Sequence, residues 1–221
     1  MNVTEAVAAR RSVRGFLDRA VDPAMLHGIV TSAARAASGG NLQPWHIDVV
    51  TGESLARLKA LMTAKLARGE TETPAYAIYP PELDMPYRDR RFGVGEAMYR
   101  EIGIPRADKA ARRLWFARNF RFFDAPAALF CTVDRRMGPP QWSDLGMYLQ
   151  TVMLLAVEAG LATCAQECWA MYPETVTQLI ATPPERMLFC GMAIGYEDVS
   201  APANRLRSER APEAEWLTVH G

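Results

Sequence analysis

The chain has 221 residues, of which 49% are hydrophobic and 23% are charged, and its 25 basic residues balance 25 acidic ones. This composition excludes a long disordered or collagen-like chain and fits one large domain or two small ones. The zero net charge argues against a general nucleic-acid binder, which needs a surplus of basic residues.

Helix and strand signals alternate through the first half of the chain. Asn2 and Glu5 fit a capping box that begins a first helix. Asp22-Pro23 begins a second helix, because aspartate caps a helix and proline suits its first position, and Ser38-Gly39-Gly40 ends it. The pattern then predicts a strand over 45–51, a polar-faced helix over 53–68, a loop over 70–86 and a basic, aromatic helix over 105–123.

The second half begins with an apolar run over 127–133, which is typical of a buried strand. A helix over 145–159 follows, capped by Ser143 or Asp144 and closed by Gly160. It is apolar on nearly every face, so we expect it to be buried in a core or against another subunit. The remaining signals are a short strand near 163, a helix over 173–181, a strand over 187–194 and a polar tail over 201–221 whose residues 216–219 can add an edge strand.

These elements mix helices and strands as an α+β fold. Neither the N-terminal helix nor the tail has enough apolar residues for a core of its own, so a partner subunit is the simplest surface for both. The four cysteines (131, 164, 168 and 190) form neither a disulfide framework nor a zinc pattern, and we expect them to be reduced and mostly buried. With no secretory signal and no apolar run long enough for a membrane span, the protein is expected in the cytoplasm.

Two arginine clusters are candidate anion sites. Arg10, Arg11, Ser12 and Arg14 follow the first helix, and like charges this dense favour a nearby anion. A second cluster lies at 204–210, and the two can converge on one phosphate. The alternative for the first cluster is a solvated basic turn. All basic residues except three lysines are arginine. This excess of arginine can reflect bidentate binding of anions or, alternatively, codon bias.

Two further segments can contact a ligand. In 38–45, glycines allow close backbone approach, and Asn41 and Gln43 carry amides suited to a heteroaromatic edge or to hydroxyl groups. The alternative is an ordinary connecting loop. In 164–169, Glu167 is either a general base or, as we prefer, a residue of which only the backbone matters. No nucleophile elbow, dinucleotide fingerprint or P-loop occurs, which argues against hydrolase, dehydrogenase and kinase functions.

Taken together, these motifs resemble the nitroreductase family of flavin enzymes. The resemblance runs over roughly 3–219 and rests on RRSVRGF, SGGNLQPWHIDVV, the apolar helix before GLATCAQECW, and NRLRSERAPE. The segments 79–109 and 118–126 look like the branch that contains 4-nitrobenzoate reductases. The resemblance implies an α+β intertwined homodimer with a mixed or antiparallel central sheet and two FMN sites in the interface. It also implies one domain over 1–221, in which about 70–125 covers the substrate and 201–221 is an arm on the partner subunit.

The same resemblance assigns roles to individual residues. It implies that Arg10 and Ser12 hold the FMN phosphate, that Arg11 makes a backbone or ribityl contact, and that Arg14 faces N1 and O2 of the flavin. A cation there stabilises the negative charge of reduced flavin. The C-terminal phosphate clamp is implied to be Ser208 with Arg210, or Arg207 if the tail shifts register.

Further contacts are implied from the two other segments. Ser38 and Gly39 match contacts made from the other subunit, although many relatives have Pro-Ser-Ser where this chain has Ser-Gly-Gly. Asn41 and Gln43 match edge and ribityl contacts. The loop that faces N5 and O4 with its backbone comprises Gln166, Glu167 and Cys168.

The implied activity is reduction of nitroaromatic compounds by NADH or NADPH, in two-electron steps with ping-pong kinetics and without a metal or a protein acid or base. Alternatives are other flavin reactions on the same fold (reductive dehalogenation, ene reduction or dehydrogenation), a non-catalytic FMN-binding protein and a plain anion-binding module. Residues 86–136 carry 12 basic and 6 acidic residues, a balance of +6. We hypothesise that part of this segment attracts anionic substrates such as nitrobenzoate, unless its arginines pair with acids elsewhere.

Overall fold

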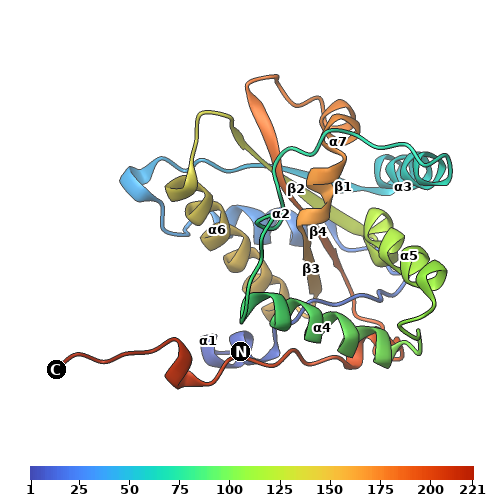
Figure 1. Cartoon of the computed structure of the whole chain (residues 1–221). Coiled ribbons are helices and arrows are strands. Elements are labelled where there is room, and N and C mark those ends of the chain that lie inside the picture. The colour runs from blue at the N-terminus through green and yellow to red at the C-terminus, as the bar shows by residue number, and fades with distance from the viewer.

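A computed structural model describes residues 1–221 and confirms the α+β class. Its centre is a four-stranded antiparallel sheet in the order β1-β2-β4-β3 (Figure 1). The strands are β1 (His46–Thr51), β2 (Ala127–Asp134), β3 (Ala162–Gln166) and β4 (Arg186–Gly195). The helices are α1 (Val3–Ala9), α2 (Pro23–Ala33), α3 (Gly52–Ala67), α4 (Tyr87–Glu101), α5 (Lys109–Ala117), α6 (Pro139–Glu158) and α7 (Pro173–Leu179). Short 3-10 helices are η1 (Gly39–Asn41), η2 (Arg118–Asp124), η3 (Glu167–Met171), η4 (Pro202–Arg205) and η5 (Glu213–Glu215).

Strand β2 is buried on both faces, as its continuous apolar character predicts. Its side chains alternate between two hydrophobic cores, because successive residues of a strand point to opposite faces. Ala128 and Phe130 enter the core beneath α3, η2, η3 and α7. Leu129 and Cys131 enter the core beneath α2 and α6. The sheet is therefore the middle of three layers.

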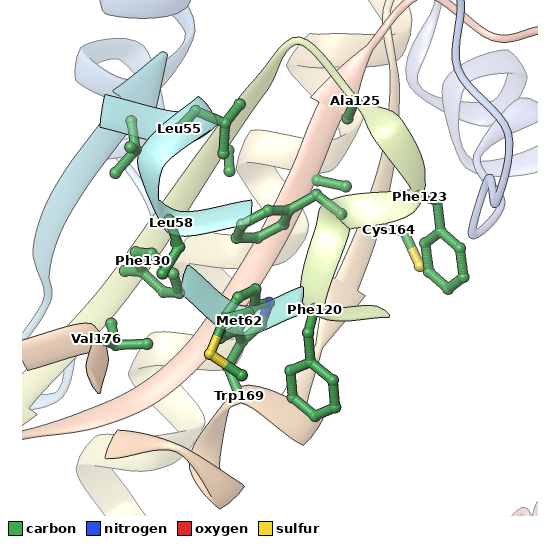
Figure 2. Packing of buried hydrophobic residues seen from close by; sticks show 14 of the residues in the cluster. Leu55, Leu58, Met62, Phe120, Phe123, Ala125, Phe130, Cys164, Trp169 and Val176 are labelled. Atoms are coloured by element: carbon green, nitrogen blue, oxygen red, sulfur yellow. The ribbon is translucent and has the colours of Figure 1, made fainter. Parts of the chain in front are cut away.

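Aromatic rings dominate the first of these cores (Figure 2). Trp169 stacks on Phe122 with 4.7 Å between ring centroids, and it meets Phe130 edge-on at 5.2 Å. Burying these rings bends the chain: Phe122 and Phe123 adopt left-handed φ angles of 52° and 51°. The prediction of one helix over 105–123 is therefore wrong, since α5 ends at Ala117 and tertiary packing overrides local helix preference beyond it.

Helix α6 begins earlier than predicted. It starts at Pro139, and the backbone N–H of Gly138 donates to the side chain of Gln141 at 3.2 Å. Ser143 and Asp144 therefore lie inside the helix and do not cap it. Only one face of α6 is buried within the chain, and Met147 on another face is 40% exposed.

Two other segments differ from the prediction. Helix α4 was not predicted, because it is rich in arginine and none of its residues is buried. Residues 216–219 form no edge strand. The C-terminal end of the tail instead extends away from the other elements (Figure 1), and Trp216 and Val219 are 68% and 82% exposed. All four cysteines are free, with Cys168 half-buried and the others buried, and no helix is long and apolar enough to cross a membrane.

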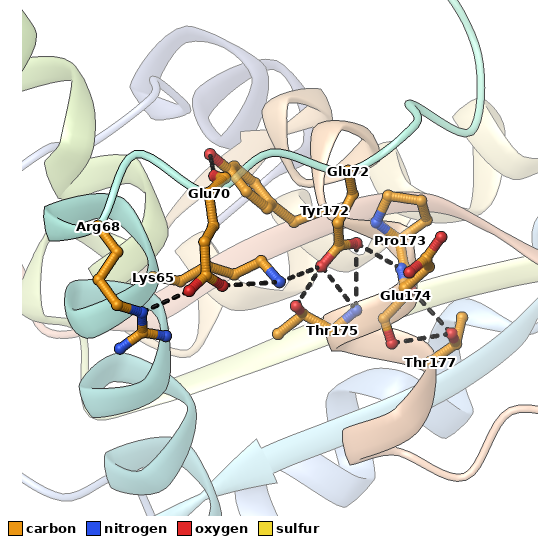
Figure 3. Close-up of polar contacts among 9 residues, drawn as sticks. All are labelled: Lys65, Arg68, Glu70, Glu72, Tyr172, Pro173, Glu174, Thr175 and Thr177. Atoms are coloured by element: carbon orange, nitrogen blue, oxygen red, sulfur yellow. Dashed lines mark hydrogen bonds and ion pairs between the residues drawn. The ribbon is translucent and has the colours of Figure 1, made fainter.

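A buried carboxylate holds the start of the 70–86 loop (Figure 3). The side chain of Glu72 is only 4% exposed and accepts hydrogen bonds from the backbone N–H groups of Glu174 at 2.7 Å and Thr175 at 3.2 Å. It also accepts from the Thr175 hydroxyl and pairs with Lys65 at 3.0 Å. Glu72 thus caps α7, whose own N-cap residue provides no side-chain hydrogen bond.

We expect Glu72→Gln to destabilise the fold by about 1–3 kcal/mol at pH 7, because an amide cannot accept all of these bonds. Burial raises the pKa of Glu72, but the hydrogen bonds from Thr175 and Lys65 outweigh it, so the pKa lies below its ordinary value. A lowered pKa stabilises the folded state above the unfolded pKa of about 4.3, and that stability is lost as pH falls through the folded pKa. The free energies of unfolding of variant and parent, measured in urea, should therefore differ at pH 7, and this difference should become smaller below about pH 4. A difference that grows there would contradict the assignment.

Candidate functional site

The first arginine cluster lies along the outer edge of the sheet. Ser12 pairs with Thr163 of β3 in a parallel bridge, and the backbone N–H of Val13 donates to the Thr163 carbonyl at 2.9 Å. Strand β3 then leads directly into Gln166, Glu167 and Cys168. Tertiary structure therefore brings together two of the segments that the sequence singled out, although about 150 residues separate them.

The guanidinium groups of this cluster differ in their partners. Arg11 forms an ion pair with Glu197. Arg10 has no carboxylate partner, and the guanidinium of Arg14 donates only to the Ser12 carbonyl at 3.3 Å. All three residues are half-buried. Two cations without a carboxylate, beside the Ser12 hydroxyl, form a donor set that fits an anion such as phosphate.

Buried polar atoms without partners gather around the same edge. They include the Thr163 hydroxyl, the side-chain carbonyl of Gln166 and Nε of Arg11. The amide nitrogen of Gln166 donates to the backbone carbonyl of Asn119 at 2.8 Å, so this side chain is held against η2. Because buried polar groups normally have partners, these atoms indicate a place where a polar ligand fits.

Asn204 connects the start of the tail to the arginine cluster. Its side-chain oxygen accepts from the backbone N–H of Arg14 at 2.7 Å, and its amide donates to the Gly15 carbonyl at 2.9 Å. The residue is 6% exposed. Sequence analysis missed this role, and the only available signal was an amide residue at the head of the second arginine cluster. Ser208 and Arg210, which bond each other at 2.8 Å, follow in the exposed part of the tail.

The loop before β1 packs against α6 and leads into the edge strand opposite β3. It contains Ser38, Gly39, Asn41 and Gln43, and β1 and β3 are the two edge strands. The N–H of Gln43 donates to the Ser38 hydroxyl at 2.8 Å, and the Gln43 amide donates to Asn41 Oδ1 at 3.1 Å. Within one chain, none of these residues forms a hydrogen bond with Arg10 or Ser12, which lie beside β3.

A groove of about 560 Å³ lies between α4 and the tail. Four arginines line it: Arg90, Arg100, Arg207 and Arg210. Of these, only Arg90 forms an ion pair, with Glu215 of the tail. Because apolar residues of α4 line the same groove, it combines cationic and apolar surface.

Comparison with known proteins gives consistent matches. The family model described as the Nitroreductase family matches residues 7–196. The chain is 37% identical to nitrobenzene nitroreductase of Ectopseudomonas oleovorans, over 99% of this chain and 97% of that one. It is 36% identical to 4-nitrobenzoate reductase of Pseudomonas putida, over 92% and 89%. Among solved structures, the FMN and NADPH-dependent nitroreductase NfnB from sphigopyxis sp. strain HMH matches with a TM-score of 0.96 and 49% identity over 100% of both chains.

Proposed function

The chain belongs to the nitroreductase family, and from that premise we propose that it is an FMN-dependent oxidoreductase that reduces nitroaromatic compounds with NADPH or NADH. The observation that carries the proposal is the arrangement along β3, where Arg10, Ser12 and Arg14 lie beside the strand that leads into Glu167 and Cys168. The side chains of Arg10, Ser12 and Arg14 can donate hydrogen bonds to a phosphate. The turn after β3 can present the backbone of Glu167 and Cys168 to the flavin ring.

We further propose that the working unit is a homodimer. Ser12 pairs with β3, one edge strand of the sheet, whereas the segment 38–43 packs against α6 and precedes β1, the other edge strand. One flavin contacts Asn41, Gln43 and the arginine cluster together most simply when the loop comes from a second copy. The exposed face of α6 around Met147 and the extended tail with Trp216 support this assembly.

The residues of this chain bind and orient the cofactor. In the proposed site, Arg10, Ser12, Ser208 and Arg210 hold the phosphate, and Arg14 stabilises negative charge on the pyrimidine side of the flavin. Bound FMN would supply the redox chemistry, because it would accept a hydride equivalent from NADPH and pass it to the nitro group. The remaining proposed contacts are Arg11, Ser38, Gly39, Asn41, Gln43 and the backbone of Gln166, Glu167 and Cys168.

The proposal is tested with purified protein reconstituted with FMN. We expect flavin absorbance that survives gel filtration, bleaching of that absorbance by NADPH without air, and its rapid return when a nitroarene such as nitrobenzene is added. Protein that retains no FMN would overturn the proposal. Protein that is bleached by NADPH but is not reoxidised by any nitroarene would leave a flavoprotein with a different substrate.

We also propose that anionic nitroarenes such as 4-nitrobenzoate are favoured substrates. In the segment 86–136, six basic side chains have no ion-pair partner, whereas only Glu101 and Asp108 are unpaired acids. These basic residues are Arg91, Arg100, Arg106, Lys109, Arg113 and Arg135. Of the ion pairs, only that of Arg90 with Glu215 uses an acid from outside the segment, so pairing lowers the charge from +6 to +5 and leaves a cationic surface.

We expect kcat/KM for 4-nitrobenzoate to fall several-fold between 20 and 300 mM salt, while the value for nitrobenzene stays nearly constant. Screening weakens attraction between separated charges and leaves a neutral substrate unaffected. The measurement compares both substrates in the same buffers at saturating NADPH. Equal salt dependence for the two substrates would refute steering by this segment.

A further inference from the structure

A buried carboxylate lies against the loop that precedes β1. Asp144 of α6 is 4% exposed. Its Oδ2 accepts a hydrogen bond from the Ser38 hydroxyl at 3.1 Å and one from the backbone N–H of Gly39 at 3.2 Å. No lysine, arginine or histidine forms an ion pair with it. A buried carboxylate is costly without hydrogen bonds, so Asp144 and the loop donors depend on each other.

Ser38 transmits this contact through the loop. Its hydroxyl donates to Asp144 and accepts from the backbone N–H of Gln43 at 2.8 Å, which uses both its donor and an acceptor. The N–H of Asn41 donates to the Ser38 carbonyl at 3.0 Å. One side chain on α6 therefore fixes both ends of the segment 38–43.

The same segment holds an unfavourable backbone conformation. Gly40, Asn41 and Gln43 have left-handed φ angles of 59°, 56° and 50°. Glycine adopts this region freely and asparagine tolerates it, whereas glutamine rarely does. Such conformations persist only where the surrounding contacts impose them, and here the imposing contacts come from Asp144 and Ser38.

We propose that Asp144 is a positioning residue that pre-organises the segment 38–43 for contact with FMN. The inference rests on the proposed function, in which Asn41 and Gln43 meet the flavin. Both side chains are exposed, so they are available to a ligand while their backbone is held from below. A loop ordered before binding avoids the entropy cost of becoming ordered on binding, which strengthens affinity.

The test compares Asp144→Asn with the parent protein as full-length reconstituted enzyme. Asparagine keeps one acceptor oxygen for Ser38 and Gly39, but it removes the negative charge and the second oxygen that accepts from the Gly39 N–H at 3.3 Å. We expect the Kd for FMN, measured by flavin fluorescence, to rise about tenfold, since the bonds from Ser38 and Gly39 lose the charge that strengthens them. In the apo-protein, hydrogen exchange at the amides of Gly39 and Gln43 should accelerate, because their acceptors are Asp144 and Ser38.

Variants of Ser38 separate positioning from general stability. Ser38→Ala also removes the proposed contact of this residue with FMN, so it should weaken binding at least as much; adding Asp144→Asn should weaken it no further, because both changes break one connected network. Ser38→Thr keeps the hydroxyl and should restore affinity. Glu72→Gln is the control: it also replaces a buried carboxylate that accepts from a hydroxyl and from backbone N–H groups, but this carboxylate contacts α7 and Lys65 and not the segment 38–43. It should lower stability and leave the Kd for FMN unchanged.

Unchanged FMN affinity and unchanged amide exchange in Asp144→Asn would overturn the inference while the proposed function stands. An equal loss of affinity in Glu72→Gln would also overturn it, since destabilisation would then account for the effect. Parent protein that binds no FMN would instead overturn the proposed function and, with it, the role of the loop in flavin binding. Amide exchange would still report separately whether Asp144 holds the loop.

Discussion

Gly191→Ala should destabilise the protein by about 3 kcal/mol, and its thermal midpoint should fall by about 6–12 °C. A Cβ atom at this position of β4 would lie 2.4 Å from Cδ1 of Trp169 and 3.0 Å from Cγ. Trp169 has no room to move, because it is fully buried among aromatic rings (Figure 2). A rigid indole cannot rotate away as a flexible side chain would, so strand and ring must separate.

A double-mutant cycle with Trp169→Ala tests this explanation. Trp169→Ala alone should cost about 3–5 kcal/mol, and in that background the added methyl group of Gly191→Ala should cost almost nothing. Gly28→Ala is the control, because a Cβ atom at this exposed helical position meets nothing within 4 Å. It should be neutral or slightly stabilising. Additive costs for Gly191→Ala and Trp169→Ala in the cycle would refute the predicted contact.

The double variant Arg10→Ala/Arg210→Ala should weaken FMN binding by about 2–6 kcal/mol, since each charge-assisted bond to a phosphate contributes about 1–3 kcal/mol. Neither guanidinium has a carboxylate partner in the chain: that of Arg10 forms no hydrogen bond, and that of Arg210 bonds only Ser208 and the Glu209 carbonyl. Both are therefore available to an anion. Titration of apo-protein by flavin fluorescence measures the effect.

Riboflavin, which lacks the phosphate, is the internal control for this prediction. Its affinity should be the same for the parent and the double variant, so the difference isolates the phosphate contact. Arg35→Ala, at an exposed position beyond α2, should change neither affinity. An equal loss of affinity for FMN and riboflavin would mean that the two arginines support the fold of the site and do not hold phosphate.

Local patterns predicted most elements of this fold. The Asn2 and Glu5 capping box is present as predicted, with both reciprocal bonds at 2.9 Å, because it depends on residues three positions apart. The prediction of one helix over 105–123 was wrong because Phe122 and Phe123 follow the packing of their rings. Helix α4 lacks a buried face, so no apolar periodicity marks it.

Asp144 shows most clearly where sequence reasoning ends. Its position before an apolar run made it a candidate helix cap, yet Pro139 starts the helix a full turn earlier and turns Asp144 toward Ser38. No short-range pattern links two residues 106 positions apart, and the same holds for the contact between Asn204 and Arg14. Both contacts exist because the sheet and its helices bring distant segments together.

The sequence by itself determined the family resemblance, the α+β class, the residue types suited to FMN and the balanced charge that argues against nucleic acid. These properties depend on composition and on neighbours a few positions apart, which the order of residues specifies directly. Only the tertiary structure decided that Ser12 lies on the edge of β3, that Ser38 bonds Asp144 of α6, and that Arg11 pairs with Glu197 whereas Arg10 remains without a carboxylate. Such pairings follow from how the layers pack on the sheet, which places residues far apart in the chain within reach of one another.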